Sequence, residues 1–281
     1  MKQFKQVLSV IFALALILSA SAHARNEVRV ISLVPSQTEM LFHLGLGEYV
    51  MGISDYCNYP EAARSRQKVG ALELNIERIM SLRPTLLVDV NNMHKKYALL
   101  FSQLGLNYVN FSVTRMDQLP RMAEDLAKLI GKPDKGAEFA AEWHKKITEI
   151  SVSLPAEKPK VYFEIWDTPM QAAGAQSYIG DMIRTAGGDN IVTDISEFPV
   201  VNSETILNAD PDVIIIAYPL TDKTSIEKRP GWQKLQAVRN KQIYALDQDL
   251  FIRPGPRNLD ALMQLREIFR KIASGREKRS K

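Results

Sequence analysis

The chain has 281 residues, of which 46% are hydrophobic and 24% are charged, and its formal net charge is +4. Two of the basic residues lie in the N-terminal leader and several others in the C-terminal stretch GREKRSK, so the charge does not favour nucleic-acid binding. Cys57 is the only cysteine, which excludes an internal disulfide and means that an ordinary hydrophobic core must supply the stability.

Residues 1–24 are typical of a secretory signal peptide. Two lysines precede the apolar run VLSVIFALALILSA at 7–20, and small residues ending at Ala22 and Ala24 provide two candidate cleavage sites. The run is shorter than the roughly 20 apolar residues that a membrane helix needs. An uncleaved anchor is the alternative, but the pattern predicts an exported protein cleaved near Ala22 or Ala24.

Beyond the leader, short apolar runs alternate with longer stretches of helical periodicity, which predicts βαβ units and parallel sheets. A long helical block, about Asp134 to Leu154, divides the chain, and a final helix is expected from about Asn258 to Ala273. The runs predicted as strands are VRVISLV (28–34), YVMGIS (49–54), TLLVDV (85–90), NYVNFSV (107–113), KVYFEIW (160–166), NIVTDI (190–195), DVIIIAY (212–218) and QIYALD (242–247).

The two halves of the chain repeat one pattern. IERIMSLRPTLLVDV (76–90) and SETILNADPDVIIIA (203–217) both pass from a helix through a proline into a strand. SQTEMLFHLGLG (36–47) and SYIGDMIRTAGG (177–188) both begin with serine and end with glycines suited to a helix C-terminus. Because both pairs occur in the same order, the sequence predicts two duplicated α/β lobes.

The predicted organisation is a signal peptide (1–24), an N-terminal lobe (25–133), a linking helix (134–156), a C-terminal lobe (157–275) and a solvated basic tail (276–281). A single helix of about 20 residues would span about 30 Å. It would join the lobes through one stiff connection, which predicts limited closure around a ligand.

The stretch around Ser36 is the first candidate binding element. Ser36 and Glu39 have the S-x-x-E spacing of a capping box, which predicts a helix beginning directly after the first strand. Ligands of open α/β sheets bind beyond the carboxyl ends of the strands, so this helix N-terminus is expected to face a cleft, although a purely structural cap is the alternative. Neither glycine-rich nucleotide motif occurs, which disfavours a dinucleotide enzyme.

Aromatic and polar residues follow the other predicted strands. Aromatic rings beside amides and an arginine suit a large, flat ligand with polar edges, although each residue could instead pack its own loop. The candidate ligand-binding residues are Ser36, Tyr56, Asn92, His94, Trp166, Phe198, Tyr218, Asp249 and Arg253.

No metal site and no catalytic site is predicted. The histidines beyond the leader, His43, His94 and His144, are about 50 residues apart and fall on different elements. We expect His43 in the core and His144 in a packing or solvent-facing role. His94 falls on a predicted cleft loop, where it could meet a metal-centred ligand. Cys57 is interpreted as a structural, half-buried thiol, with a nucleophile or ligand as the alternative.

The motifs SLVPSQTEMLFHLGLGE, DYCNYP, IERIMSLRPTLLV, AGGDNI, ADPDVIIIA and DLFIRPGPR, in this order, resemble the periplasmic cobalamin- and iron-siderophore-binding proteins of ABC importers. The likeness is greatest to the vitamin B12-binding branch and covers nearly the whole chain after the leader. It implies two Rossmann-like lobes with parallel sheets joined by a single long helix. It also implies a periplasmic monomer that is not an enzyme, needs no cofactor, and passes a bound corrinoid to an inner-membrane permease.

The resemblance carries over to particular residues. Tyr56 matches a tyrosine that lines the corrinoid cleft, and Phe198 falls where the B12-binding branch has a tryptophan. Asp249 and Arg253 fall on polar ligand contacts of the last loop. The chain departs from the family where the best-known B12 binder has first-lobe tryptophans, because it has Val90 and Asn110 there.

The resemblance also implies docking on the permease through one glutamate on each lobe. The first-lobe position falls on Lys95, so Glu73 is the nearest carboxylate that could substitute, and Glu227 is the second-lobe candidate.

Two alternatives stay open. One is a ferric siderophore or haem as the ligand, although a charged siderophore would favour several arginines, and only Arg253, Arg257 and Arg115 are candidates. The other is an exported α/β enzyme that uses Asp167, Asp249 or Cys57, which would need a nucleophile and a base within hydrogen-bond reach.

Overall fold

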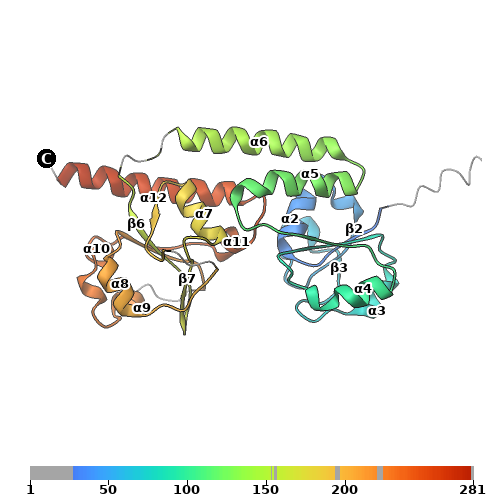
Figure 1. Ribbon diagram of the computed structural model, residues 1–281, viewed down its shortest axis with the longest axis horizontal. Coiled ribbons are helices and arrows are strands. Elements are labelled where there is room, and N and C mark those ends of the chain that lie inside the picture. The colour runs from blue at the N-terminus through green and yellow to red at the C-terminus, as the bar shows by residue number, and fades with distance from the viewer. Residues whose placement is uncertain (1–27, 153, 155–156, 194–196, 220–223, 280–281) are drawn as a thin grey trace, which may run out of the picture.

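The computed structural model describes residues 28–152, 154, 157–193, 197–219 and 224–279, and Figure 1 shows them as two α/β lobes beneath a layer of long helices. The predicted signal peptide lies outside the described residues. Within them, no helix combines the length and the apolar character that crossing a membrane requires.

The N-terminal lobe is built on a parallel sheet with the strand order β3-β2-β1-β4-β5. Its apolar runs become buried strands, and all five side chains of β4 are buried. The strands are β1 (Val30–Ser32), β2 (Val50–Ile53), β3 (Gln67–Lys68), β4 (Leu86–Val90) and β5 (Tyr108–Phe111). The helices are α2 (Pro35–His43), α3 (Ile76–Ser81), α4 (Ala98–Gln103) and α5 (Leu119–Leu129), with 3₁₀ turns η1 (Gly47–Tyr49), η2 (Glu61–Ala63), η3 (Lys95–Tyr97) and η4 (Met116–Gln118).

The C-terminal lobe has the strand order β10-β9-β6-β7, with β8 also paired to β6. Its strands are β6 (Lys160–Asp167), β7 (Met170–Ala172), β8 (Asp189–Asn190), β9 (Val213–Ile216) and β10 (Ile243–Ala245). Its helices are α7 (Tyr178–Thr185), α8 (Ser203–Ala209), α9 (Thr224–Glu227), α10 (Gln236–Arg239), α11 (Gln248–Ile252) and α12 (Asn258–Arg279), with the 3₁₀ turn η5 (Trp232–Lys234). Strand β7 folds back antiparallel on β6, whereas β8, β9 and β10 pair parallel to their neighbours.

The duplicated pattern read from the sequence is present. Helix α3 leads directly into β4 and helix α8 into β9, and both strands pair parallel to the first strand of their lobe. Asn75 and Asn202 cap these helices in the same way, each accepting a backbone N–H three residues further on. The fold class, two parallel-sheet α/β lobes joined by a long helix, is confirmed, apart from strand β7.

Helix α6 (Pro133–Ser151) is the connection between the lobes. Its 19 residues give a continuous rod, about 28 Å long at 1.5 Å per residue. It buries Phe139, Trp143 and Ile150 along one face, which explains the periodicity of the sequence. Helix α12 lies alongside α6 (Figure 1), so the link is braced by a second helix that the sequence did not assign to it.

The lobes share a hydrophobic core. One cluster of buried residues extends from Val30 of β1 through Trp143 of α6 to Phe163 of β6 and Phe251 of α11. Smaller clusters fill the outer side of each sheet. Because the largest cluster crosses from one lobe to the other, packing as well as the linking helix resists their separation.

The capping box predicted for Ser36 and Glu39 is wrong. Helix α2 begins two residues earlier than a cap at Ser36 requires, with Val34 at the N-cap and Pro35 as its first residue, and no side chain caps it. Proline suits the first helical position because its fixed φ matches the helix and its missing N–H would be unbonded there. The equivalent serine of the second lobe, Ser177, is a true cap, because its hydroxyl accepts the Gly180 N–H at 3.0 Å.

Candidate functional site

The carboxyl ends of the N-terminal strands carry exposed aromatic and amide side chains. Tyr56 and Tyr59 lie in the loop after β2, and Tyr56 is 58% exposed. Asn91 and Asn92 follow β4 with positive φ angles of 51° and 59°, a left-handed conformation that asparagine tolerates. The Asn92 N–H donates to Asn110 Oδ1 at 2.7 Å, which fixes the turn and leaves the residue exposed.

His94 follows these asparagines, but its side chain is only 2% exposed. Its Nδ1 lies 3.2 Å from Asp89 Oδ1 and its Nε2 lies 2.8 Å from the Ala71 carbonyl oxygen. Burial disfavours the positively charged ring and by itself would lower the pKa of His94. The bonds to Asp89 and Ala71 outweigh this effect, so the pKa of His94 is raised. Both ring nitrogens face acceptors, a geometry that favours the doubly protonated form of the ring. The expectation that His94 is free to meet a metal-centred ligand is therefore wrong.

The C-terminal lobe presents an aromatic face on β6, β7 and the segment beside them. Trp166 pairs with Gln171 of β7, and Gln171 bridges to Val200, so Trp166 and Val200 point to the same side. Phe198 lies two residues before Val200 in the same segment. Trp166 is 48% exposed and Phe198 is 40% exposed, so this face is open to a ligand.

Tyr218 lies behind Trp166, with ring centroids 6.3 Å apart, and is itself buried. Its hydroxyl donates to Glu164 Oε1 at 2.6 Å, and burial together with this bond raises its pKa. Arg229 and Tyr162 also bond to the Glu164 carboxylate, at distances of 2.6–2.8 Å. Tyr218 therefore supports Trp166 from below rather than offering its hydroxyl to a ligand.

Glu164 and Arg229 were not anticipated from the sequence. The signal was a glutamate inside the apolar run KVYFEIW, since a carboxylate that is completely buried requires a partner. No local pattern identifies Arg229, 65 residues away, as that partner.

Asp249 and Arg253, predicted as ligand contacts of the last loop, lie against the other lobe. Arg253 forms an ion pair with Glu39 of α2 at 2.9 Å and donates to Asn58 Oδ1 at 2.7 Å. Asp249 accepts from Asn58 Nδ2 at 3.1 Å and pairs with Arg253 at 2.9 Å. The loop that carries Tyr56 is thus in direct contact with the C-terminal lobe.

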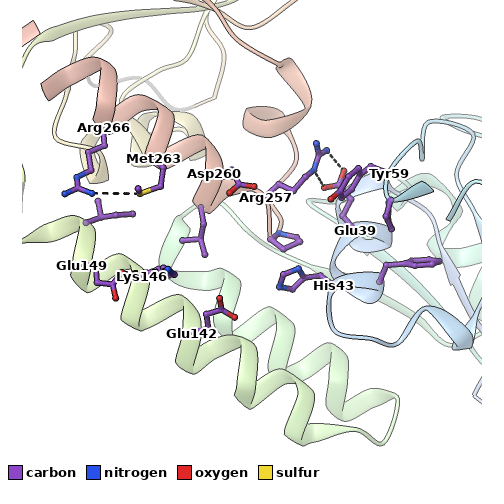
Figure 2. A pocket seen from close by; sticks show the side chains of 15 residues that line it. Glu39, His43, Tyr59, Glu142, Lys146, Glu149, Arg257, Asp260, Met263 and Arg266 are labelled. Atoms are coloured by element: carbon purple, nitrogen blue, oxygen red, sulfur yellow. Dashed lines mark hydrogen bonds and ion pairs between the residues drawn. The ribbon is translucent and has the colours of Figure 1, made fainter. Parts of the chain in front are cut away.

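A pocket of about 530 Å³ lies between α2, α6 and α12, where the lobes meet (Figure 2). Glu39, Tyr59 and Arg257 border it on the side of the inter-lobe contact, and Glu142, Lys146 and Glu149 line it from α6. None of the predicted ligand-binding residues lines this pocket. The exposed aromatic residues at the strand ends are therefore a separate feature.

The chain matches the family described as periplasmic binding protein over residues 30–250. It belongs to that family.

Individual binding proteins are similar over nearly their whole length. The uncharacterized ABC transporter substrate-binding lipoprotein YvrC of Bacillus subtilis is 26% identical over 86% of this chain and 80% of that protein. The haem-binding protein RhuT of Roseiflexus, in its apo form, is 27% identical with a TM-score of 0.80, over 88% of this chain and 99% of RhuT. The vitamin B12-binding protein BtuF of Vibrio cholerae is 26% identical with a TM-score of 0.76, over 88% of this chain and 97% of BtuF.

The protein is therefore a substrate-binding protein of the ABC importer class, which works with a membrane permease, and it is not an enzyme. Cys57 fits that conclusion. It is buried against Thr38 Oγ1 at 3.1 Å, and burial raises the pKa of its thiol, so it is a structural residue. Within the described residues, no three His, Cys, Asp or Glu side chains are grouped so that they could hold a metal ion.

His43 and His144, the other histidines among the described residues, differ in setting. His43 is exposed on α2 beside the pocket, with its ring 5.5 Å from that of Phe139, so its expected place in the core is wrong. His144 is exposed on α6, as expected.

The two glutamates predicted to dock on the permease lie on different lobes of the binding protein. Glu73 is exposed and bonds with Lys96 and with the Tyr97 hydroxyl, and the bonds with Lys96 lower its pKa. Glu227 is partly exposed at the end of α9. Their role in docking stays a prediction.

Proposed function

We propose that this binding protein captures a corrinoid, most specifically cobalamin, between its lobes and delivers it to the permease of an ABC importer. The observation that carries the proposal is the exposure of aromatic side chains at the strand ends of both lobes: Tyr56 on one, and Trp166 and Phe198 on the other. Contiguous exposed apolar surface rimmed by polar residues is typical of a ligand-binding groove.

The chemistry of these surfaces suits a large planar ligand. Aromatic rings supply dispersion and stacking, about 0.5–1.5 kcal/mol per ring pair beyond the burial of area. Asn92 is exposed and offers amide groups that can exchange hydrogen bonds with the amide substituents at the edge of a corrin ring. Ser36 is buried in the first turn of α2, so its part in binding would be to support the loop surfaces.

The charge of the site also favours a corrinoid over a ferric siderophore. Arg253 and Arg257 are already paired with Glu39, and Arg253 also pairs with Asp249. Arg115 is paired with Asp117 at 3.0 Å. The three arginines that an anionic chelate would need are therefore neutralised by this protein's own carboxylates.

Haem is the second candidate, because RhuT and BtuF are equally similar to this chain. Haem iron takes an axial histidine or tyrosine in many proteins. His94 is closed off by Asp89 and Ala71, so a haem would rely on the exposed Tyr56 or Tyr59.

The proposed setting is the periplasm, with the signal peptide cleaved near Ala22 or Ala24 and the protein acting as a monomer. Glu73 and Glu227 are the proposed contacts to the permease. No resident cofactor is proposed, and the corrinoid is cargo.

Equilibrium dialysis against cyanocobalamin and hemin tests the proposal. We expect cyanocobalamin to bind with one site, and Phe198→Ala and Trp166→Ala each to weaken binding about tenfold or more. Leu99→Ala is the control, because Leu99 is an exposed apolar side chain on α4. Equal cyanocobalamin affinity in all four proteins would exclude the aromatic surface as the site.

A further inference from the structure

A group of charged and amide side chains holds the lobes together on the side of the site. We call it the inter-lobe clasp and define it as Glu39 and Asn58 from the N-terminal lobe with Asp249, Arg253 and Arg257 from the C-terminal lobe. The partners lie up to 218 residues apart in the sequence.

Glu39 is the centre of the clasp. Its carboxylate is 1% exposed and binds both arginines: Oε1 meets Arg253 at 2.9 Å and Arg257 at 2.7 Å, and Oε2 meets Arg257 at 2.7 Å. Arg257 is therefore held by two parallel bonds, the geometry that makes a guanidinium–carboxylate pair strong and directional. Its guanidinium also lies over the Tyr59 ring, 4.4 Å from the centroid.

Asn58 completes the clasp from the neighbouring loop. Its oxygen accepts from Arg253 and its nitrogen donates to Asp249, so one amide bonds to both members of the Asp249–Arg253 pair. Asn58 lies between Tyr56 and Tyr59, which ties the loop that carries these two tyrosines to the opposite lobe.

A second contact lies elsewhere on the lobe boundary. The buried Asp181 carboxylate of α7 accepts the Met116 N–H of η4 at 2.7 Å, with Arg115 3.6 Å away. The lobes are thus joined at two polar contacts in addition to α6 and the shared core, so a loss at one contact should loosen the lobes without separating them.

We propose that Glu39 and Asn58 are positioning residues, which fix the separation of the lobes and the place of the Tyr56–Tyr59 loop before any ligand arrives. Without the Glu39 carboxylate, two nearly buried guanidiniums would face each other with Asp249 as their one remaining acidic partner in the clasp. The two positive charges would repel each other, so we expect the lobes to move apart at this contact. A preorganised site avoids the cost of ordering on binding, so Glu39 and Asn58 should raise affinity through the geometry that they fix. The part of this inference that concerns the ligand rests on the proposed function.

Inter-lobe distance is the direct readout of the clasp. Spin labels at Glu77→Cys and Glu204→Cys report it, since both glutamates are exposed and occupy equivalent places on α3 and α8. Cys57 is buried, so labelling of the otherwise unchanged protein serves as the background check. We expect a narrow distance distribution in this parent and a broadened or shifted one in Glu39→Gln.

Two further variants make the distance experiment decisive. Glu267→Gln removes an equal charge from an exposed part of α12 and should leave the distribution unchanged. Asn58→Ala removes only an exposed amide, so it should fold normally and broaden the distribution less than Glu39→Gln does. If Asn58→Ala and every folded Glu39 variant keep the parent's narrow distribution, the clasp is overturned.

Titration with cyanocobalamin tests the positioning role. If the binding-competent geometry falls to about a tenth of the population, the apparent Kd of Glu39→Gln rises about tenfold. Unchanged affinity in a variant with broadened distances would overturn the positioning role. If the parent protein binds no cyanocobalamin, the proposed function fails, while the distance measurement without ligand still decides whether the clasp exists.

Discussion

The two lobes share a fold but stabilise their buried carboxylates differently. In the N-terminal lobe, Asp89 of β4 accepts bonds from His94 and from the Tyr108 hydroxyl. In the C-terminal lobe, Glu164 of β6 is bound by Arg229 and two tyrosine hydroxyls. Arginine keeps its charge at every physiological pH and histidine does not.

Both networks lie under the surfaces that carry the candidate site. Asp89 and His94 flank the turn of Asn91 and Asn92, and Glu164 supports Tyr218 beneath Trp166. Duplicated topology does not fix where a buried charge lies, because Asp89 is on β4 whereas Glu164 is on β6, the counterpart of β1, and the partner of each carboxylate is specific to its lobe. This difference also predicts that the two lobes respond differently to mutation and to pH.

The largest effect should come from removing the carboxylate of the C-terminal network. Glu164→Gln leaves Arg229 largely buried without its counter-charge, so we expect a loss of about 3–5 kcal/mol in the free energy of unfolding. Urea denaturation followed by circular dichroism measures it, with Glu204→Gln, an exposed glutamate of the same lobe, as the control. A loss no larger than that of the control would mean that the network is not stabilising.

A smaller loss is expected for the corresponding change in the N-terminal lobe. In Asp89→Asn the histidine can lose its proton and become neutral, so we expect about 2–3 kcal/mol, the scale of lost bonds to a buried charged group. The same denaturation series at neutral pH measures the difference between the lobes. A loss as large as that of Glu164→Gln would remove the proposed contrast between histidine and arginine.

The pH dependence of stability should come from the N-terminal lobe. The pKa of His94 is raised above its ordinary value of 6.5, so its stabilising effect is complete below pH 6.5 and is lost as the pH rises through the raised value. Burial opposes ionisation of Asp89, but the bonds from His94, Tyr108 and the backbone outweigh it and lower the pKa of Asp89 below 3.8. The stabilisation that the Asp89 carboxylate supplies is therefore lost only as the pH falls below 3.8.

We therefore expect the Tm of the wild type to fall as the pH rises from 6 through the raised His94 pKa, and this fall to be reduced in His94→Gln. Thermal melts at matched ionic strength provide the measurement. An equal fall of the Tm in the wild type and in His94→Gln would mean that groups other than His94 cause the pH dependence.

The smallest expected effect concerns the two serines in equivalent positions. Ser177→Ala removes a true N-cap and should cost about 1 kcal/mol. Ser36→Ala should cost less, because Ser36 lies inside the helix and caps nothing. Denaturation curves of the two variants compare them directly, and equal costs would show that Ser36 stabilises its helix in some other way.

Local signals in the sequence predicted most of the fold. The proline that ends α3 and α8 and the 3.6-residue periodicity of α6 act over a few residues, so duplicated lobes and the linking rod could be read directly. Strand β7 was missed because a short hairpin after Trp166 leaves no apolar run of its own.

The site was less predictable because its polar groups are fixed by distant partners. The S-x-x-E pattern suggested a cap, but Glu39 is bound by arginines 214 and 218 residues away. Asp249 and Arg253 were expected to face a ligand, and they also bond across the lobes. A loop position suggested an exposed His94, whereas Asp89 and Ala71 bury it. Tyr56, Trp166 and Phe198 were expected at a cleft because they follow strand ends, and all three are exposed.

Isothermal titration of the purified protein with cyanocobalamin, hemin and a ferric hydroxamate, side by side, decides whether a corrinoid is the ligand. We expect saturable one-to-one binding of cyanocobalamin, tighter than that of either iron compound, and a marked weakening in Phe198→Ala. Tighter binding of hemin or of the ferric hydroxamate, or no heat with any of the three, would contradict this expectation.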